Sequence, residues 1–224
     1  MKRRLFSVFA VLLFSLLLSG TDAHAQSETP QIELGVQFST LVFDEPDFFD
    51  ETRTEPGFGA RLTFNVNDNF ALEAEGNFFP RSSRPTSTSG GRALQGQFGV
   101  KAGKRYEKFG IFAKARPGFV TFGNVFTPVG FQRVEFEGQP FFFPDFKDEV
   151  KTHFSTDVGG VIEFYPSRRI VTRFDFGDTI IRYGDRPGIV FISPSPGQVT
   201  PMIIQQPGET KHNFQFSAGV GFRF

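Results

Sequence analysis

The chain has 224 residues with 24 basic and 24 acidic side chains, so it offers no strong basic field for nucleic acid. It has no cysteine, which excludes a disulfide framework, a thiolate nucleophile and a cysteine metal site. Its aromatic residues are 33 Phe and 3 Tyr with no Trp, although its mean hydropathy is slightly negative.

The first 25 residues have the order of a secretory signal peptide. Basic residues at positions 2–4 precede the apolar run Leu5–Leu18, and Ala23-His24-Ala25 follows as a small-x-small cleavage site. The apolar run is shorter than the roughly 20 residues that a transmembrane helix needs. We therefore expect residues 1–25 to be removed and residues 26–224 to form one domain, with 21 basic and 23 acidic side chains.

Eight stretches of the mature chain alternate apolar and polar residues with a period of two, which predicts β-strands. In chain order they cover residues 32–39, 58–66, 70–78, 94–102, 109–119, 154–164, 170–177 and 214–224. No stretch of the mature chain keeps apolar residues at spacings of three and four, so no helix is predicted.

The connections between these strands alternate in length. The short ones are residues 67–69, 103–108 and 166–169, and the long ones are residues 44–56, 80–91, 121–151 and 183–211. A transmembrane barrel has this order, with tight periplasmic turns and longer outer loops. Because a long connection comes first and the strand number is even, both termini are expected in the periplasm.

The strands of a soluble β-sandwich also alternate apolar and polar residues, so the positions of the aromatic residues along the strands help to separate the two folds. Phe70 and Phe78 bracket one strand, and Phe109 and Phe119 bracket another. Such pairs are typical of the aromatic girdles at the two interfaces of a bilayer. The sequence therefore predicts an all-β fold, an eight-stranded antiparallel up-and-down transmembrane β-barrel.

The opposite phase of the strands carries six acidic and six basic residues. They are Glu33, Glu73, Glu75, Asp157, Glu163, Asp175, Arg61, Lys101, Lys114, Arg116, Arg173 and Arg223. The lumen of an eight-stranded barrel is only wide enough to be filled by side chains, so charges inside it must pair. We expect a charge network that plugs the lumen, whereas on a sandwich these residues would be solvated.

The last strand, residues 213–224, resembles the terminal strand of bacterial outer-membrane proteins, which alternates and ends on an aromatic residue. The mature chain resembles the small eight-stranded barrels typified by the OmpA transmembrane domain and OmpX. That resemblance implies a Gram-negative outer membrane, contact with lipid and lipopolysaccharide, and reading of Phe224 by the barrel-assembly machinery. The chain departs from OmpA by having no periplasmic domain after the last strand, and its girdles have no Trp.

Two long connections, residues 121–151 and 183–211, are unusually apolar for solvated loops. One interpretation is that strands five to eight extend beyond the membrane and bury these residues against each other. The other is an exposed patch for a surface partner or lipopolysaccharide. Extension is the interpretation we favour first.

One pair of residues raises the question of catalysis. His153 and Ser155 share the inward phase with Asp157, and the pair resembles the His-x-Ser element of outer-membrane lipid A deacylases, but the flanking Arg and Asn pattern of that family is missing. His212 is expected to be a solvated residue. We assign no catalytic, cofactor or metal residue. The leading function is a structural or surface-interaction barrel, ahead of a narrow passive channel and, third, a lipid A-modifying hydrolase.

Overall fold

The computed structural model describes residues 30–44, 52–81, 86–136, 139–195 and 198–224. The predicted signal peptide, residues 1–25, lies outside these ranges. Within them, no helix is long and apolar enough to cross a membrane.

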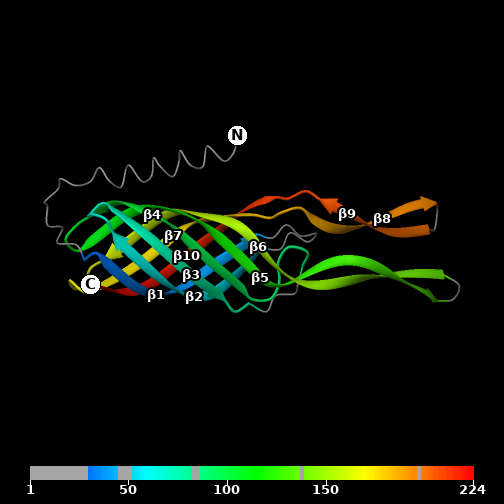
Figure 1. Cartoon of the computed structure of the whole chain (residues 1–224), viewed down its shortest axis with the longest axis horizontal. Coiled ribbons are helices and arrows are strands. Elements are labelled where there is room, and N and C mark those ends of the chain that lie inside the picture. Colours follow the sequence, from blue (N-terminus) through cyan, green and yellow to red (C-terminus); the bar gives the residue numbers. More distant parts are fainter. Residues whose placement is uncertain (1–29, 45–51, 82–85, 137–138, 196–197) are drawn as a thin grey trace, which may run out of the picture.

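Ten strands make up the described chain, and eight of them close into an antiparallel barrel (Figure 1). The barrel strands are β1 (Ile32–Asp44), β2 (Thr52–Asn65), β3 (Phe70–Phe79), β4 (Ala93–Arg105), β5 (Phe109–Phe136), β6 (Gln139–Phe164), β7 (Ile170–Arg182) and β10 (Thr210–Arg223). The other two, β8 (Arg186–Ser195) and β9 (Gln198–Gln206), pair only with each other. The predicted all-β barrel of eight antiparallel strands is confirmed.

The barrel closes where the first strand meets the last. Pairing between β1 and β10 runs from Glu33 opposite Arg223 to Leu41 opposite Gln215, so neither strand leaves a free edge along this length. An open edge in lipid would leave backbone groups without hydrogen-bond partners. Closure therefore satisfies the backbone in the way that a membrane requires.

Alternation along each barrel strand separates an apolar outside from a polar inside. On β1, for example, Leu34, Val36 and Phe38 are exposed, whereas Gln37 and Ser39 are buried. Successive side chains of a strand point to opposite faces, so the period of two in the sequence becomes two surfaces of the barrel wall.

The two ends of the barrel differ. At one end, called the turn end, lie the short connections, the start of β1 and the C-terminus (Figure 1). From the opposite end, called the ribbon end, β5 and β6 continue past the barrel as a paired ribbon, and the β8–β9 hairpin forms a second ribbon (Figure 1).

The long connections contain more strand than the sequence predicted. Residues 121–136 and 139–151 are extensions of β5 and β6, as we expected first. Residues 183–211 hold the separate β8–β9 hairpin, which extends no barrel strand, so the expectation that strands seven and eight reach through this segment was wrong. Mutual burial on the β5–β6 ribbon is also incomplete, since Phe143 remains 56% exposed.

The connection predicted at residues 44–56 is shorter in the structure. Pairing of β1 with β2 continues to Asp44 opposite Thr52. Residues 52–56, Thr-Arg-Thr-Glu-Pro, carry no apolar alternation, so no strand was predicted there. Backbone pairing to β1, which needs no apolar side chain, extends β2 over these residues.

Candidate functional site in the barrel lumen

At the turn end, the lumen begins with paired charges around a tyrosine. Arg223 Nε lies 3.1 Å from a carboxylate oxygen of Glu33, and Arg105 Nη2 lies 3.7 Å from both Glu33 and Glu163. The Tyr165 hydroxyl donates a hydrogen bond to Glu163 at 2.8 Å. Burial, and then the negative charge of Glu163, raise the pKa of Tyr165 above its ordinary value, so this hydroxyl stays a donor.

One step further in, Arg173 holds two carboxylates. Its Nη2 donates to Glu73 at 2.9 Å and to Asp175 at 2.7 Å. Lys101 pairs with Glu163 and lies 3.7 Å from Glu73. Because ion pairs here share their partners, this level is a network and not a set of separate pairs.

The middle of the lumen is centred on Arg116. Its Nη1 lies 2.5 Å from Glu75, and its Nε donates to Asp157 at 2.9 Å. Lys114 also pairs with Asp157, at 2.8 Å. Arg61 completes this level, 3.3 Å from Asp175.

The structure brings all twelve sequence-predicted lumen charges into this one connected cluster, the charge network, and none of them is more than 6% exposed. Sequence reasoning missed Arg105 and Tyr165, which border the network at the turn end. Arg105 lies at the end of β4, beyond the last residue of the apolar alternation. The alternation therefore did not indicate that its side chain faces the lumen.

A layer of amides and hydroxyls, the amide layer, covers the charge network on its ribbon side. The two are linked by Gln37, which accepts a hydrogen bond from Arg61 and donates one to Asn77, each at 2.8 Å. From Asn77 the bonds continue through Gln95 to Gln215, each at 2.9 Å. The layer consists of Ser39, Asn77, Gln95, Thr179, Gln215 and Ser217.

Above the amide layer, the ribbon end is filled by an apolar cap. Its members are Leu41, Phe43, Phe79, Ala93, Val120, Phe122, Val125, Ile181 and Tyr183. Phe43 packs edge-on against Phe79 and Phe122 at centroid distances of 6.0 and 5.7 Å. The Arg81 guanidinium lies 4.6 Å from the Phe43 ring centroid.

The sequence held a signal for the apolar cap that we missed. On β1 the apolar residues change phase after Ser39, from Leu34, Val36 and Phe38 to Leu41 and Phe43. Such a change of phase moves the apolar side chains from the outer surface to the lumen.

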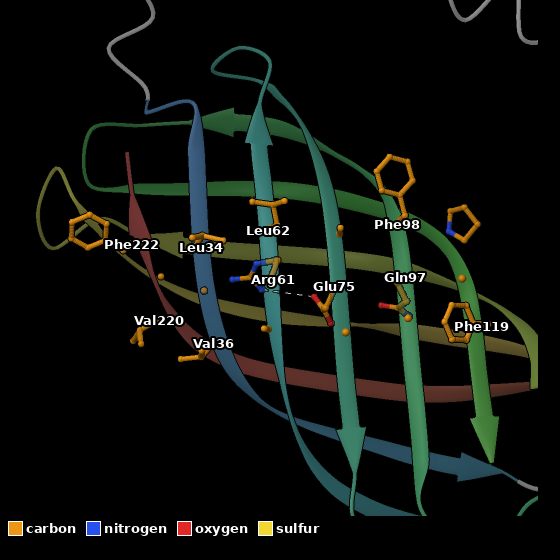
Figure 2. A pocket seen from close by; sticks show the side chains of 18 of the residues that line it. Leu34, Val36, Arg61, Leu62, Glu75, Gln97, Phe98, Phe119, Val220 and Phe222 are labelled. Atoms are coloured by element: carbon orange, nitrogen blue, oxygen red, sulfur yellow. Dashed lines mark ion pairs between the residues drawn. The ribbon is translucent and has the colours of Figure 1, made fainter. Parts of the chain in front are cut away.

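Outside the barrel, the wall is apolar and slightly hollowed (Figure 2). A hollow of about 1020 Å³ is lined mainly by outward-facing side chains such as Leu62 and Phe98. Figure 2 also shows the Arg61–Glu75 ion pair, 3.9 Å long, which belongs to the lumen side of the same strands. The hollow therefore belongs to the lipid-facing band and has little polar chemistry.

The hydrogen-bond contacts of His153, Ser155 and Asp157 are not those of a proton relay. His153 Nε2 lies 3.1 Å from the Thr88 carbonyl oxygen. Asp157 accepts its hydrogen bonds from Arg116. The Ser155 hydroxyl is buried and has no hydrogen-bond partner among the residues that the structure describes.

Two further predicted positions lie at the surface. His212 is exposed, and its Nδ1 is 2.5 Å from Asp178. Phe224 is 63% exposed in the apolar phase beside Phe222, with ring centroids 5.0 Å apart. Over the described ranges, no group of three or more acidic or His side chains could hold a metal ion.

Several solved structures are similar to this chain at low sequence identity. Among solved structures, the attachment invasion locus protein Ail of Yersinia pestis is 11% identical, with 88% of this chain and 99% of that one covered and a TM-score of 0.47. Neisserial surface protein A is also 11% identical, with 86% and 96% covered and a TM-score of 0.43. OprG of Pseudomonas aeruginosa is 9% identical, with 88% and 97% covered and a TM-score of 0.45.

No curated protein matches the chain. A family model described as the outer membrane protein beta-barrel domain matches residues 9–224, nearly the whole chain. The resemblance to small eight-stranded outer-membrane barrels is thus confirmed. The chain belongs to the outer membrane protein beta-barrel domain family and is a barrel of the outer membrane.

Proposed function

We propose that this protein is a non-enzymatic outer-membrane barrel whose lumen is closed by its own side chains and which acts at the cell surface through its two ribbons. In this proposal the turn end and both termini face the periplasm, and the ribbon end faces the outside.

The observation that supports the proposal is the succession of three sets of buried side chains inside the barrel. The charge network, the amide layer and the apolar cap follow one another along the barrel. Moving an ion through it would require breaking ion pairs such as Arg116–Asp157 in a water-poor interior. It would also require hydrating a cluster of packed aromatic rings, which is unfavourable.

The ribbons support a surface role. On the β5–β6 ribbon, Phe141, Phe143 and Phe146 are each about half exposed, and on the β8–β9 ribbon Phe191 is 67% exposed. Apolar side chains exposed away from the lipid-facing band mark a protein or membrane contact. Such ribbons are suited to contact with a surface partner or with lipopolysaccharide.

Solute uptake by liposomes separates this proposal from the narrow passive channel. The refolded barrel is reconstituted into liposomes, and swelling in a small sugar is compared with empty liposomes and with liposomes that hold a general porin. We expect the rate of empty liposomes. Swelling that rises with the amount of barrel would support the channel.

The third candidate, a lipid A hydrolase, has its own test. Lipid A is extracted from cells that express the wild-type chain or Ser155→Ala, and its mass is measured. We expect identical lipid A in both. Loss of an acyl chain with the wild type alone would overturn the non-enzymatic proposal.

A further inference from the structure

A small cationic pocket lies at the ribbon end, in the fork where β7 leaves β6. The two strands pair only as far as Phe154 opposite Arg182, after which β6 continues with β5 and the chain turns into β8. The pocket has a volume of about 400 Å³. It is lined by Ser87, Thr88, Val150, Lys151, Thr152, His153, Phe154, Arg182, Gly184, Asp185 and Arg186.

Arg186 is the most unusual residue of this pocket, because its side chain is only 8% exposed. Its Nη2 lies 3.1 Å from Glu209, but Nε and Nη1 are buried and have no hydrogen-bond partner in the described part of the chain. Buried donors without acceptors are rare and destabilising. Two donor nitrogens of this guanidinium thus have no acceptor among the described residues, and an incoming acceptor would reach them only after the side chain shifts.

Lys151 adds a second positive charge. Its Nζ donates to the Ser87 carbonyl at 3.4 Å, and no carboxylate of the described ranges forms an ion pair with it. Burial lowers the pKa of Lys151, and the positive charge of Arg186 lowers it further, while Glu149 raises it in part. Repulsion between the two cations would be relieved by an anion between them.

Three carboxylates lie near these cations, namely Glu209 against Arg186, Glu149 near Lys151 and Asp185 in the lining. Asp185 lines the pocket, but its Oδ1 accepts the backbone N–H of Gly208 at 2.7 Å. Arg182 is exposed at the mouth of the fork and has no ion pair with any described carboxylate. The pocket therefore collects Lys151, Arg182 and Arg186 around a single lining carboxylate.

One wall of the same pocket is apolar and faces outward. Val150 is 68% exposed and Phe154 is 59% exposed, and Phe154 belongs to the outward-facing aromatic residues that bracket the barrel strands. This wall places the cations at the edge of the lipid-facing band, which is the level at which a bilayer holds its headgroups.

We propose that this fork binds the phosphate monoester of a membrane lipid, with the acyl chains of that lipid against Val150 and Phe154. A phosphate monoester carries a charge of about −1.5 to −2 at pH 7 and three strong acceptor oxygens. Arg186 and Lys151 both offer charged N–H donors, which match such a group. The inference deepens the proposed surface role and rests on its placement of the ribbon end at the outer leaflet.

The test uses the full mature barrel refolded in neutral detergent micelles. Phosphatidic acid is the lipid probe, phosphatidylcholine its uncharged control and inorganic phosphate the free-anion probe. Bound lipid is counted by native mass spectrometry, and inorganic phosphate is titrated by calorimetry. The variants are Lys151→Gln and Arg186→Gln, with Lys147→Gln, an exposed lysine of the same strand, as the matched control. Heat-modifiable gel mobility verifies that every variant is folded.

We expect the wild type and Lys147→Gln to retain phosphatidic acid in preference to phosphatidylcholine. Lys151→Gln and Arg186→Gln should each weaken retention by about tenfold, the effect of losing one charge-assisted hydrogen bond. Equal retention by all folded variants would overturn the site. Inorganic phosphate that binds as tightly as the lipid would overturn the lipid-borne assignment. Neither result affects the closed lumen, which the liposome assay tests independently.

Discussion

Arg116 shows what a charge inside this barrel needs. It is fully buried, and it holds Glu75 and Asp157 through contacts of 2.5 to 2.9 Å. Gly99 makes room for it, because a Cβ there would lie 2.9 Å from Arg116 Cγ and closer still to the backbone of β5. The ion pairs of Arg116 contribute less to stability than its loss would cost, because that loss would leave buried carboxylates without a partner.

Replacing Arg116 with Ala should therefore destabilise the barrel by roughly 3–5 kcal/mol, the cost of leaving a buried carboxylate without its partner. Urea unfolding of the refolded barrel in lipid vesicles measures this change. Arg133→Ala is the control, because that arginine forms an exposed pair with Glu135 on the ribbon and should cost at most about 1 kcal/mol. Similar losses for the two variants would mean that water reaches the charge network.

Substitution of Leu62 tests the outer surface of the barrel wall. It lies on the outward face of β2 between Phe58 and Phe64, and it lines the apolar hollow. Leu62→Arg should cost about 2–4 kcal/mol if the residue meets the bilayer midplane. Leu62→Ile should be nearly neutral in the same unfolding experiment. If the charged and the apolar substitution cost the same, the assigned inside and outside of the wall would be wrong.

The barrel strands and the β5–β6 ribbon lie in different environments. Every barrel strand has an exposed outer face and a buried inner face, whereas the β5–β6 ribbon beyond Val125 has largely exposed side chains on both faces. Two-stranded ribbons are only marginally stable by themselves, so this ribbon depends on the barrel that holds its base.

The barrel, in contrast, should not depend on the ribbon. We expect it to survive excision of residues 128–146 with a two-residue Asn-Gly turn joining Thr127 to Lys147, which are paired in the structure. Heat-modifiable mobility and the urea midpoint should stay close to those of the intact chain. A barrel that no longer forms would show that the ribbon takes part in folding.

The eight barrel strands were predictable because lipid outside and a polar lumen inside impose the period of two on every span. The twelve lumen charges were found through the same phase. The hairpin β8–β9 was missed because it has no such two-sided environment, and its apolar residues occur in runs such as Ile189-Val190-Phe191-Ile192. The amide layer carries no charge to mark it, and the apolar cap reverses the expected phase.

For the whole molecule, we propose that assembly depends on the last residue of the chain. Phe224 extends the outward apolar phase of β10, and its N–H donates to the Ile32 carbonyl at 2.8 Å. As apolar surface alone, its loss would cost about 1.5–3 kcal/mol, and the barrel would still form. As the signal that the family resemblance implies, its loss should leave the protein in the periplasm.

We expect a chain that stops at Arg223 to be depleted from the outer membrane and degraded, while Phe224→Tyr inserts normally. Fractionation of cells that express each chain, followed by heat-modifiable gel mobility, measures this difference. Normal outer-membrane yield of the shortened chain would reject the signal role of Phe224.

Single-channel recording across a planar bilayer tests whether the side chains of the barrel close its lumen. The wild-type barrel is inserted at neutral pH in high salt, and its insertion is verified by recovery of folded protein from the membrane. We predict a flat baseline without stepwise currents, because an ion would have to disrupt the charge network, the amide layer and the apolar cap to pass. Stable, uniform steps that scale with the number of inserted barrels would contradict the closed lumen.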